Sequence, residues 1–229
     1  MKDRIRSGML VYRINSSPDG VSVDAFDVSR GDSVRIRAPA AVCALPRFIA
    51  QRIVEGVDVV KGLEYSPWMV ANATLDRLPE GRGAATSWDN VFRESRSLGY
   101  VVATHQNMRP VPRETVLTHY WPLDELPPSE SRRKALERSY SSWCDEILAD
   151  LTRVHAGLDQ HVRNLDVWLW GHGMIRPIPG FIWGADRARM LQPHGRVHFA
   201  HSDMSGISIF EEAFTRGVQA ARAVIQELA

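Results

Sequence analysis

The sequence predicts a protein with an α/β part and an α+β part, in which a mixed or antiparallel sheet packs against helices. Three observations predict this fold class: short alternating strands begin the chain, aromatic and β-branched segments surround a long amphipathic helix in its middle, and a strand followed by a helix ends it. With 229 residues, the chain is long enough for a substantial core in one large domain or two small ones.

Residues 8–46 form a predicted β-meander. Its strands are MLVYRINSS, VSVDAFDV and VRIRAPAAVCALP, separated by the turn sequences PDG and SRGDS. No polar side chain occurs from Ala38 to Pro46, which predicts a strand that is buried on both faces. A short helix is expected in PRFIAQRIVEG, because Pro46 lies near its start and Gly56 lies just beyond its end.

The middle of the chain predicts strands on either side of a long helix. The strand candidates are YSPWMVANATLDRL, LGYVVATHQ, ETVLTHYWPL and VRNLDVWLWGH. The helix is predicted over residues 129–155, because apolar side chains recur three and four residues apart at Leu136, Tyr140, Trp143, Ile147, Leu151 and Val154. The prolines and glycines of GMIRPIPGFIWG exclude a long regular element there.

The C-terminal segment GRVHFAHSDMSGISIFEEAFTRGVQAARAVIQELA predicts a strand, a turn and a helix. The strand is expected to end at an exposed acid, Asp203. Ser208 and Glu211 match the S-x-x-E capping box, and the start of such a helix favours an anion or an electron-rich oxygen. One face of the helix is predicted to be apolar: Phe210, Phe214, Gly217, Val218, Ala221, Ile225 and Leu228.

The composition excludes several classes of protein. A net charge of +1 argues against a nucleic-acid footprint and favours a small molecule or another protein as partner. Cys43 and Cys144 lack CxxC spacing and are expected to be buried free thiols, with a disulfide between them left open. No apolar run reaches about 18 residues and the N-terminus lacks the apolar region of a signal peptide, so a cytoplasmic protein is expected.

Other chemical motifs are weak. GRGAAT at residues 81–86 starts like a dinucleotide-binding loop, but it lacks the third glycine and a preceding buried strand. His194, His198, His201 and Asp203 are closely spaced, but residues an odd number apart point to opposite faces of a strand. We therefore predict no metal site. The sequence also lacks the G-x-S-x-G motif of many hydrolases.

The aromatic residues of the middle region are expected mainly in the core. They include Trp68, Trp121, Trp168, Trp170 and Trp183. Trp183 is also a candidate for lining an apolar pocket over a flat ring. His172, in WLWGHGM, is interpreted first as a packed core histidine, with a catalytic role as the alternative.

The end of the chain resembles the C-terminal flavin motif of the flavin-containing amine oxidase superfamily. That motif consists of a strand ending in an acid, a loop, and a helix beginning like GAxxSGxxAA; VHFAHSD and FEEAFTRGVQAARAV are similar to it. MLVYRI, APAAVCALPRFIAQRI, WDNVFRESRSLGYVVATHQ and GHGMIRPIPGFIWG resemble other segments of the family in the same order. The resemblance therefore covers nearly the whole chain.

The resemblance implies FAD as cofactor and hydride transfer from a substrate C–H bond to flavin N5. It implies that Asp203 hydrogen-bonds the ribityl or pyrophosphate portion and that the backbone of Val11 contacts the adenine. The backbone that would face the isoalloxazine C2 oxygen lies at Phe210, Glu211, Glu212 and Ala213. The small-molecule substrate would bind near three residues chosen by position as catalytic candidates: His172, Arg176 and Trp183.

The sequence departs from the family pattern at two points. It lacks the opening G-x-G-x-x-G unit that holds the FAD pyrophosphate, and YSPWMVANATL lacks the lysine that amine oxidases commonly place near flavin N5. The second departure argues against oxidation of an ordinary amine. The first implies that a partner subunit, a missing N-terminal part or a homo-oligomer completes the site. The alternative is a non-catalytic remnant that acts as a binding or assembly module without flavin.

The resemblance also implies a division into domains. Residues 1–57 and 184–229 would form a truncated, Rossmann-like FAD-binding domain, because they carry the meander and the C-terminal flavin motif. Residues 58–183 would form a substrate-binding domain with a mixed or antiparallel sheet and helices.

Overall fold

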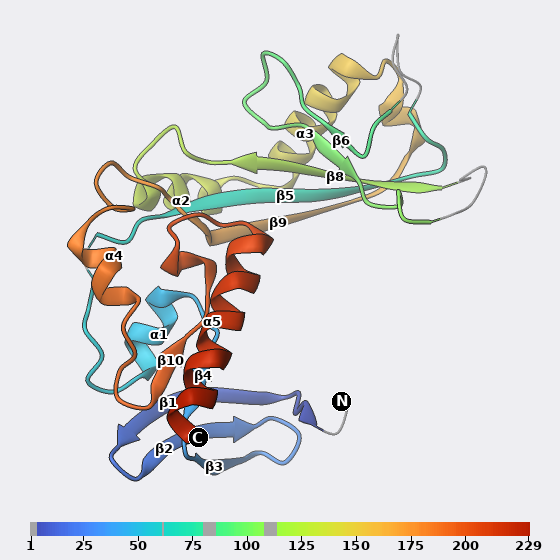
Figure 1. The fold of residues 1–229 in the computed structure, drawn as a ribbon. Helices are drawn as coiled ribbons and strands as arrows, with labels where there is room; N and C mark the ends of the chain where they lie inside the picture. Colours follow the sequence, from blue (N-terminus) through green and yellow to red (C-terminus); the bar gives the residue numbers. More distant parts are fainter. Residues whose placement is uncertain (1–3, 61, 80–85, 108–113) are drawn as a thin grey trace. The chain divides into compact units, whose positions relative to one another are not determined.

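The computed structural model describes residues 4–60, 62–79, 86–107 and 114–229 and contains two compact units (Figure 1). Unit 1 consists of Met1–Glu64 and Ile175–Ala229, and unit 2 consists of Tyr65–Met174. Each unit is described separately below. The FAD-binding and substrate-binding roles that the sequence assigns to domains 1–57 with 184–229 and 58–183 stay predictions.

Unit 1 begins with the predicted three-stranded meander, in the order β1-β2-β3 with antiparallel neighbours. Its strands are β1 (Met9–Ser17), β2 (Gly20–Asp27) and β3 (Asp32–Ala38). Gly20 is required at the first turn, because its φ is +144° and a Cβ there would lie 2.6 Å from the Ala38 carbonyl oxygen. The Asp24 carboxylate joins the three strands through Arg13 and Arg35, which lower its pKa well below the usual range.

The rest of unit 1 contains a two-stranded parallel sheet and helices. Its elements are β4 (Ala41–Cys43), α1 (Arg47–Ile53), α4 (Ala185–Met190), β10 (Val197–Phe199), the 3₁₀ turn η3 (Ser202–Met204) and α5 (Phe210–Leu228). β4 and β10 pair with each other only, as far as the described residues show. A small core lies around them, with Ile14, Val54 and Val197 among its buried members.

Two strand predictions in unit 1 are wrong. The segment after β3 is not one strand through Pro46, because the chain breaks at Pro39 before β4, and proline has no N–H to donate to a ladder. Val42 is 44% exposed, so β4 is not buried on both faces. The final strand also stops at Phe199, and Asp203 lies in η3.

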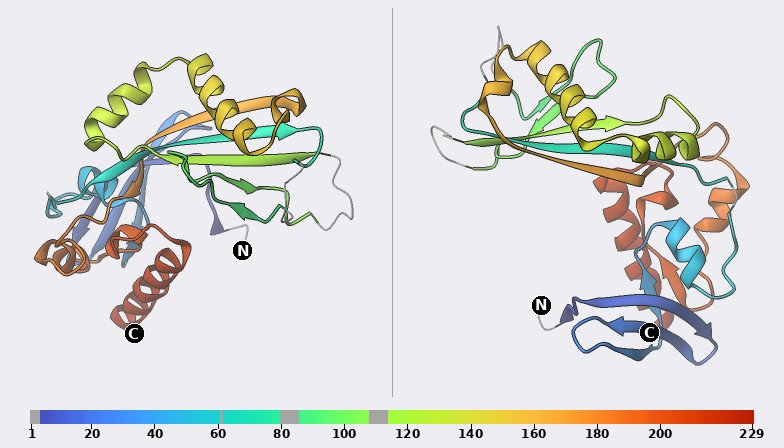
Figure 2. Two further views of the ribbon diagram at one scale, coloured as in Figure 1. Left: turned by 90° about the horizontal axis from the view of Figure 1, so that it is seen from above. Right: turned by 180° about the vertical axis from the view of Figure 1, so that it is seen from behind.

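Unit 2 is built on a five-stranded sheet with the order β6-β7-β8-β5-β9 (Figure 2). The strands are β5 (Tyr65–Leu75), β6 (Asp89–Asn90), β7 (Tyr100–Val102), β8 (Thr115–Pro122) and β9 (Val162–Ile175). The helices α2 (Pro128–Glu137) and α3 (Tyr140–Val154) cover one face, and the 3₁₀ turn η2 (Leu158–His161) leads into β9. The four predicted strands of this region are confirmed as β5, β7, β8 and β9.

The long helix predicted over residues 129–155 is two helices. The chain turns at Arg138 and Ser139, where Ser139 caps α3 by accepting a hydrogen bond from the Ser142 N–H at 3.2 Å. Leu136 and Tyr140 are 74% and 60% exposed, so the predicted apolar stripe does not continue across this turn. Apolar residues keep the helical period on both sides of the turn, so the period alone predicts one helix. Ser139, a common N-cap residue, marks the start of the second helix.

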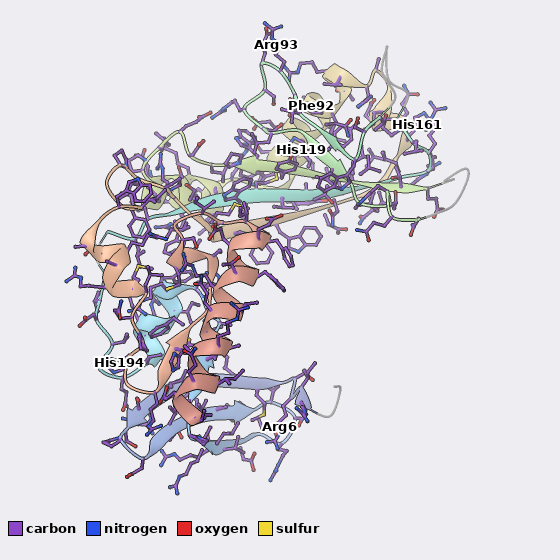
Figure 3. All side chains as sticks on the ribbon, in the orientation of Figure 1. Arg6, Phe92, Arg93, His119, His161 and His194 are labelled. Atoms are coloured by element: carbon purple, nitrogen blue, oxygen red, sulfur yellow. The ribbon has the colours of Figure 1, made fainter. Side chains whose placement is uncertain are left out.

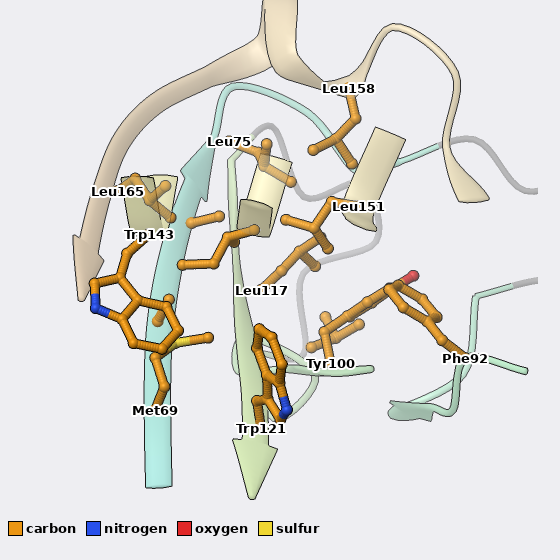
Figure 4. Close-up of a cluster of buried hydrophobic side chains, with 14 of the residues drawn as sticks. Met69, Leu75, Phe92, Tyr100, Leu117, Trp121, Trp143, Leu151, Leu158 and Leu165 are labelled. Atoms are coloured by element: carbon orange, nitrogen blue, oxygen red, sulfur yellow. The ribbon is translucent and has the colours of Figure 1, made fainter. Parts of the chain in front are cut away.

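The core of unit 2 fills the space between the sheet and its helices (Figure 4). Alternate side chains of β5 and β8 point toward α2 and α3, where Trp143, Ile147 and Leu151 of α3 are buried. Trp121 of β8 meets Trp143 edge to face, with ring centroids 5.9 Å apart. This arrangement covers one face of the sheet.

Candidate functional site

The turn η3 holds the acid on which the predicted cofactor site depends. Asp203 is only 1% exposed, which corrects the expectation of an exposed acid. Its Oδ2 accepts a hydrogen bond from the Arg47 backbone N–H at 2.7 Å, and its own N–H donates to His201 Nδ1 at 3.2 Å. The carboxylate therefore ties the end of β10 to the start of α1. Its predicted contact with the ribityl or pyrophosphate portion of FAD stays a prediction.

The start of α5 is open. Ser208 does not cap the helix, because its Oγ accepts a hydrogen bond from the Ile175 N–H at 3.1 Å. The capping box predicted with Glu211 is therefore wrong. The first N–H groups of a helix have no intrahelical acceptor, and here no side chain replaces one. The start of α5 thus has no side-chain cap in the described chain, and two acids, Glu211 and Glu212, lie in its first turn beside the positive end of the dipole.

The apolar face predicted for α5 exists but is not buried within unit 1. Phe210, Phe214, Ile225 and Leu228 are 77%, 62%, 67% and 51% exposed. Ala220 is the helix residue that is fully buried. The apolar residues do lie along one side of α5 as predicted. The described residues of unit 1 do not cover that side.

Two arginines approach the residues that follow Asp203. Arg187 of α4 donates from Nε to the Met204 carbonyl oxygen at 2.9 Å, and Arg216 of α5 donates from Nε to Ser205 Oγ at 2.9 Å. Burial and the charge of Arg187 both lower the pKa of Arg216. Sequence reasoning missed this pair, because the residues are far apart along the chain and no motif links them.

The other predicted FAD contact in unit 1 lies on β1. Val11 pairs with Ala25 of β2 and packs against the small core, and a register irregularity follows it before Arg13. An irregularity of this kind interrupts the ladder and leaves backbone groups near it less tied to the neighbouring strand. The predicted contact between the Val11 backbone and adenine stays a prediction.

The three catalytic candidates occupy different environments. His172 of unit 2 is exposed on β9, with its ring 6.1 Å from that of Tyr65, so its interpretation as a packed core histidine is wrong. Arg176 of unit 1 donates its backbone N–H to the Glu64 carbonyl oxygen at 2.7 Å. Trp183 of unit 1 is 92% exposed, which excludes it from the core. The catalytic roles of all three stay predictions.

The face of the sheet opposite the helices of unit 2 carries aromatic side chains. Trp68 and Tyr120 stack with centroids 6.5 Å apart and planes at 15°. Trp168 and Trp170 alternate with core-facing residues of β9 and are 44% and 57% exposed. The prediction that the tryptophans are mostly core residues is therefore wrong for these two. Val167 and Leu169 occupy the core side of β9, so the alternating Trp168 and Trp170 point to its other side.

A carboxylate lies near the end of this aromatic face. The Tyr120 hydroxyl donates to Asp89 Oδ1 at 2.7 Å. Burial together with this hydrogen bond raises the pKa of Tyr120 to about 12, so the phenol stays protonated. The open face of the unit 2 sheet thus combines flat apolar rings with a negative charge.

A polar cluster around Asp150 lies on the covered side of the same sheet, at His119 (Figure 3). Asp150 of α3 accepts hydrogen bonds from Ser95 Oγ at 2.8 Å and Ser97 Oγ at 2.6 Å, and it lies 3.1 Å from His119 Nε2. Arg153 also donates to it. Although burial opposes ionisation, His119 and the two serines lower the pKa of Asp150 to about 2. The cluster ties α3 to β8 and to the loop between β6 and β7.

Other sequence candidates have ordinary surroundings. His198 Nε2 lies 2.7 Å from Glu227 Oε2, and no metal-binding group of three or more ligands occurs in the described ranges. Cys43 and Cys144 are free, with Cys43 buried and Cys144 half-buried. The GRGAAT segment lies, except for its last residue, outside the described residues. No described helix is long and apolar enough to cross a membrane.

The residues of unit 1 fit a flavin in part. The free N–H groups at the start of α5 suit the pyrimidine oxygen of an isoalloxazine, and Arg187 and Arg216 add positive charge nearby. Asp203 fits less directly, because its carboxylate is buried and engaged with Arg47. Glu212 and Arg216 also replace the glycine and serine of GAxxSGxxAA, which changes the side chains at this helix start.

Two solved structures share this fold. Cyclohexylamine oxidase from Brevibacterium oxydans IH-35A is similar with a TM-score of 0.68, at 17% identity over 95% of this chain and 48% of its own. Putrescine oxidase, solved with putrescine bound, is similar with a TM-score of 0.64, at 16% identity over 95% of this chain and 48% of its own. No family model and no curated protein matches the sequence.

The comparisons confirm the resemblance at the level of the fold. Both neighbours are flavin amine oxidases, and the chain spans about half the length of each. A partial, C-terminal portion fits this coverage. The chain therefore has the fold of about half of a flavin amine oxidase.

Proposed function

We propose that this chain is part of an FAD-dependent oxidoreductase of the amine oxidase type. The observation that carries the proposal is the fold likeness to two amine oxidases over 95% of the chain. FAD, when bound, would supply the acceptor for a hydride that leaves a substrate C–H bond. The protein's own residues would position the cofactor and the substrate.

Unit 1 would provide the cofactor side. The backbone from Phe210 to Ala213 would face the isoalloxazine C2 oxygen. Its donors would be the N–H groups of residues 210–212, because the Ala213 N–H already donates to the Ile209 carbonyl oxygen at 3.2 Å. Asp203 would hold η3 against α1, in line with its hydrogen bond to the Arg47 N–H, and hydrogen-bond the ribityl or pyrophosphate portion if it turns outward. The backbone of Val11 would contact the adenine beside the irregularity of β1.

Unit 2 would provide the substrate side. The open face of its sheet carries Trp68, Tyr120, Trp168 and Trp170, whose rings suit an apolar substrate body. Of the three catalytic candidates, His172 lies in this unit, whereas Arg176 and Trp183 belong to unit 1 and are proposed near the substrate from their sequence position alone. Because β5 has no lysine, we propose a substrate other than an ordinary amine.

The site would be completed by another polypeptide segment that carries a G-x-G-x-x-G unit, or by a second copy of the chain. Two features of unit 1 support this part of the proposal. Parallel strands are normally covered by neighbours on both sides, yet β4 and β10 form a sheet of two in the described chain. The apolar face of α5 is also exposed, and an apolar surface of this kind marks an interface.

Addition of FAD to the purified chain tests the proposal. We expect bound flavin, with absorbance bands near roughly 380 and 450 nm that stay with the protein after gel filtration. We expect affinity to increase when a protein with a G-x-G-x-x-G strand-helix unit, encoded in a neighbouring reading frame, is co-expressed.

Riboflavin and FMN serve as matched ligands in this test, because they share the ring system but lack the adenine half. Protein that stays colourless with FAD, both alone and with the co-expressed unit, would overturn the proposal. That result would instead favour the binding or assembly module without flavin.

A further inference from the structure

We propose that Arg187 and Arg216 form a binding site for a phosphate group next to η3 in unit 1. The site goes beyond the proposed function, because it assigns phosphate recognition to residues of this chain. The phosphate site rests on the proposed function only if the phosphate that binds there belongs to FAD. Free phosphate compounds are the other source, and the experiment below separates the two.

Two helices bring the guanidinium groups to one place. Arg187 of α4 donates to the carbonyl oxygens of Met204 and Ile182, at 2.9 and 3.0 Å. Arg216 of α5 donates to Ser205 Oγ, at 2.9 Å. Because Met204 and Ser205 are adjacent and buried, the two arginines are held at the same turn rather than pointing freely into solvent.

Within the described ranges, Arg187 and Arg216 form no ion pair, while the buried Asp203 carboxylate of the same turn lies 3.1 Å from His201 Nδ1. Arg189 of the same helix pairs with Asp186, and Arg196 pairs with Glu227 at 3.1 Å. By contrast, the hydrogen bonds of Arg187 and Arg216 within the described chain go to uncharged oxygens. Glu212 is the acid whose charge favours the charged form of Arg216, but no ion pair joins them in the described ranges.

The two charges also repel each other. The charge of Arg187 and burial lower the pKa of Arg216, while arginine stays protonated at physiological pH. A bound dianion would relieve this repulsion and regain part of the lost solvation. The unpaired positive charge is therefore better explained by a ligand than by the fold alone.

The remaining donors favour phosphate. Each guanidinium carries five N–H bonds, and the described hydrogen bonds of Arg187 and Arg216 use only their Nε and Nη1 atoms. The Nη2 groups remain for a ligand with several acceptor oxygens, as phosphate has. Arg216 stands where the GAxxSGxxAA motif has serine, so the site is a feature of this chain.

Titration calorimetry of the full chain with inorganic pyrophosphate, FAD and riboflavin tests the site. The test variant is Arg216→Gln, which removes the charge but keeps a side chain able to donate to Ser205. The control is Arg222→Gln, which makes the same change later on α5 at an exposed position. We expect Arg216→Gln to weaken pyrophosphate and FAD binding about tenfold or more, since a charged hydrogen bond is lost. Riboflavin binding and the control should be unchanged.

The outcomes separate this inference from the proposed function. Pyrophosphate binding that depends on Arg216, without any FAD binding, supports the phosphate site and contradicts FAD as its source. FAD binding that Arg216→Gln and Arg187→Gln leave unchanged, in variants with the circular dichroism spectrum of the parent, overturns the site and leaves the proposed function standing. Equal weakening of riboflavin and FAD would also overturn it, because riboflavin has no phosphate.

Discussion

The two units of this chain differ in how completely they bury their apolar residues. In unit 2, α2 and α3 cover one face of a five-stranded sheet, and the buried cluster extends from Met69 to Leu165. In unit 1, the buried cluster around β4 and β10 has six residues, and α5 leaves Phe210 and Phe214 exposed. Unit 2 therefore covers one face of its sheet with its own helices, whereas unit 1 leaves the apolar face of its longest helix uncovered by its own described residues.

This difference separates a part whose core its own helices cover from a part with an exposed apolar surface, as the proposed incomplete site requires. A closed core repays the entropy of folding within one unit. An exposed apolar helix face beside a two-stranded parallel sheet gains free energy when another surface covers it. The residues assigned to FAD lie in the second kind of region, which agrees with a cofactor that is bound between this chain and a further segment.

The largest expected effect distinguishes the buried helix from the exposed one. Leu151→Ala should lower the free energy of unfolding by about 2–5 kcal/mol, because a fully buried side chain leaves a cavity. Ile225→Ala on α5, which is 67% exposed, should change it by less than about 0.5 kcal/mol. Denaturant unfolding measures both. Equal losses would show that the α5 face is buried in the protein in solution.

The next effect concerns the carboxylate that ties α3 to β8. Asp150→Asn should cost about 1–3 kcal/mol, because its serine, histidine and arginine partners lose a charged acceptor. Since the folded pKa of Asp150 is lowered to about 2, this stability is present above the unfolded pKa and is lost as the pH falls from about 4 toward 2.

Asp145→Asn is the matched control for that change, because Asp145 is an exposed acid on the same helix. Chemical unfolding of both variants between pH 7 and pH 3 makes the comparison. If Asp150→Asn is as stable as Asp145→Asn at neutral pH, the cluster does not tie the helix to the sheet.

A third pair of substitutions distinguishes the two faces of the unit 2 sheet. Trp170→Ala should cost less than about 1 kcal/mol, because the ring is 57% exposed, whereas Trp121→Ala on the covered face should cost about 3–5 kcal/mol. Under the proposed oxidoreductase function, Trp170→Ala should also raise the KM for substrate. An unchanged KM would remove this face from the proposed substrate side.

Much of the fold could be predicted from the sequence, because alternation in strands and the helical period are local signals. The meander and the strand containing Leu117 follow from them. The turn at Ser139 was missed because a serine cap can interrupt a helix without disturbing its apolar period. The burial of Asp203 was missed because it depends on a contact with Arg47, which is distant along the chain.

The candidate site was less predictable than the fold. Motif resemblance identified the start of α5, but the convergence of Arg187 and Arg216 depends on the packing of two helices around one turn. The aromatic face required knowing which residues of β9 point toward the helices, since Val167 and Leu169 do and Trp168 does not. Side-chain direction in a sheet with one covered face is set by its tertiary packing.

Hydrogen exchange of the full chain, measured with and without saturating FAD, tests the central claim most directly. Without FAD, the amides of β5 and β8 should exchange far more slowly than those of β10 and the first turns of α5, because β5 and β8 lie inside a five-stranded sheet over the larger core, whereas β10 belongs to a sheet of two strands over a small one. With FAD, exchange should slow in residues 202–216 and stay unchanged in α3. Slowing confined to α3, or no change in residues 202–216 when the flavin is bound, would contradict the account.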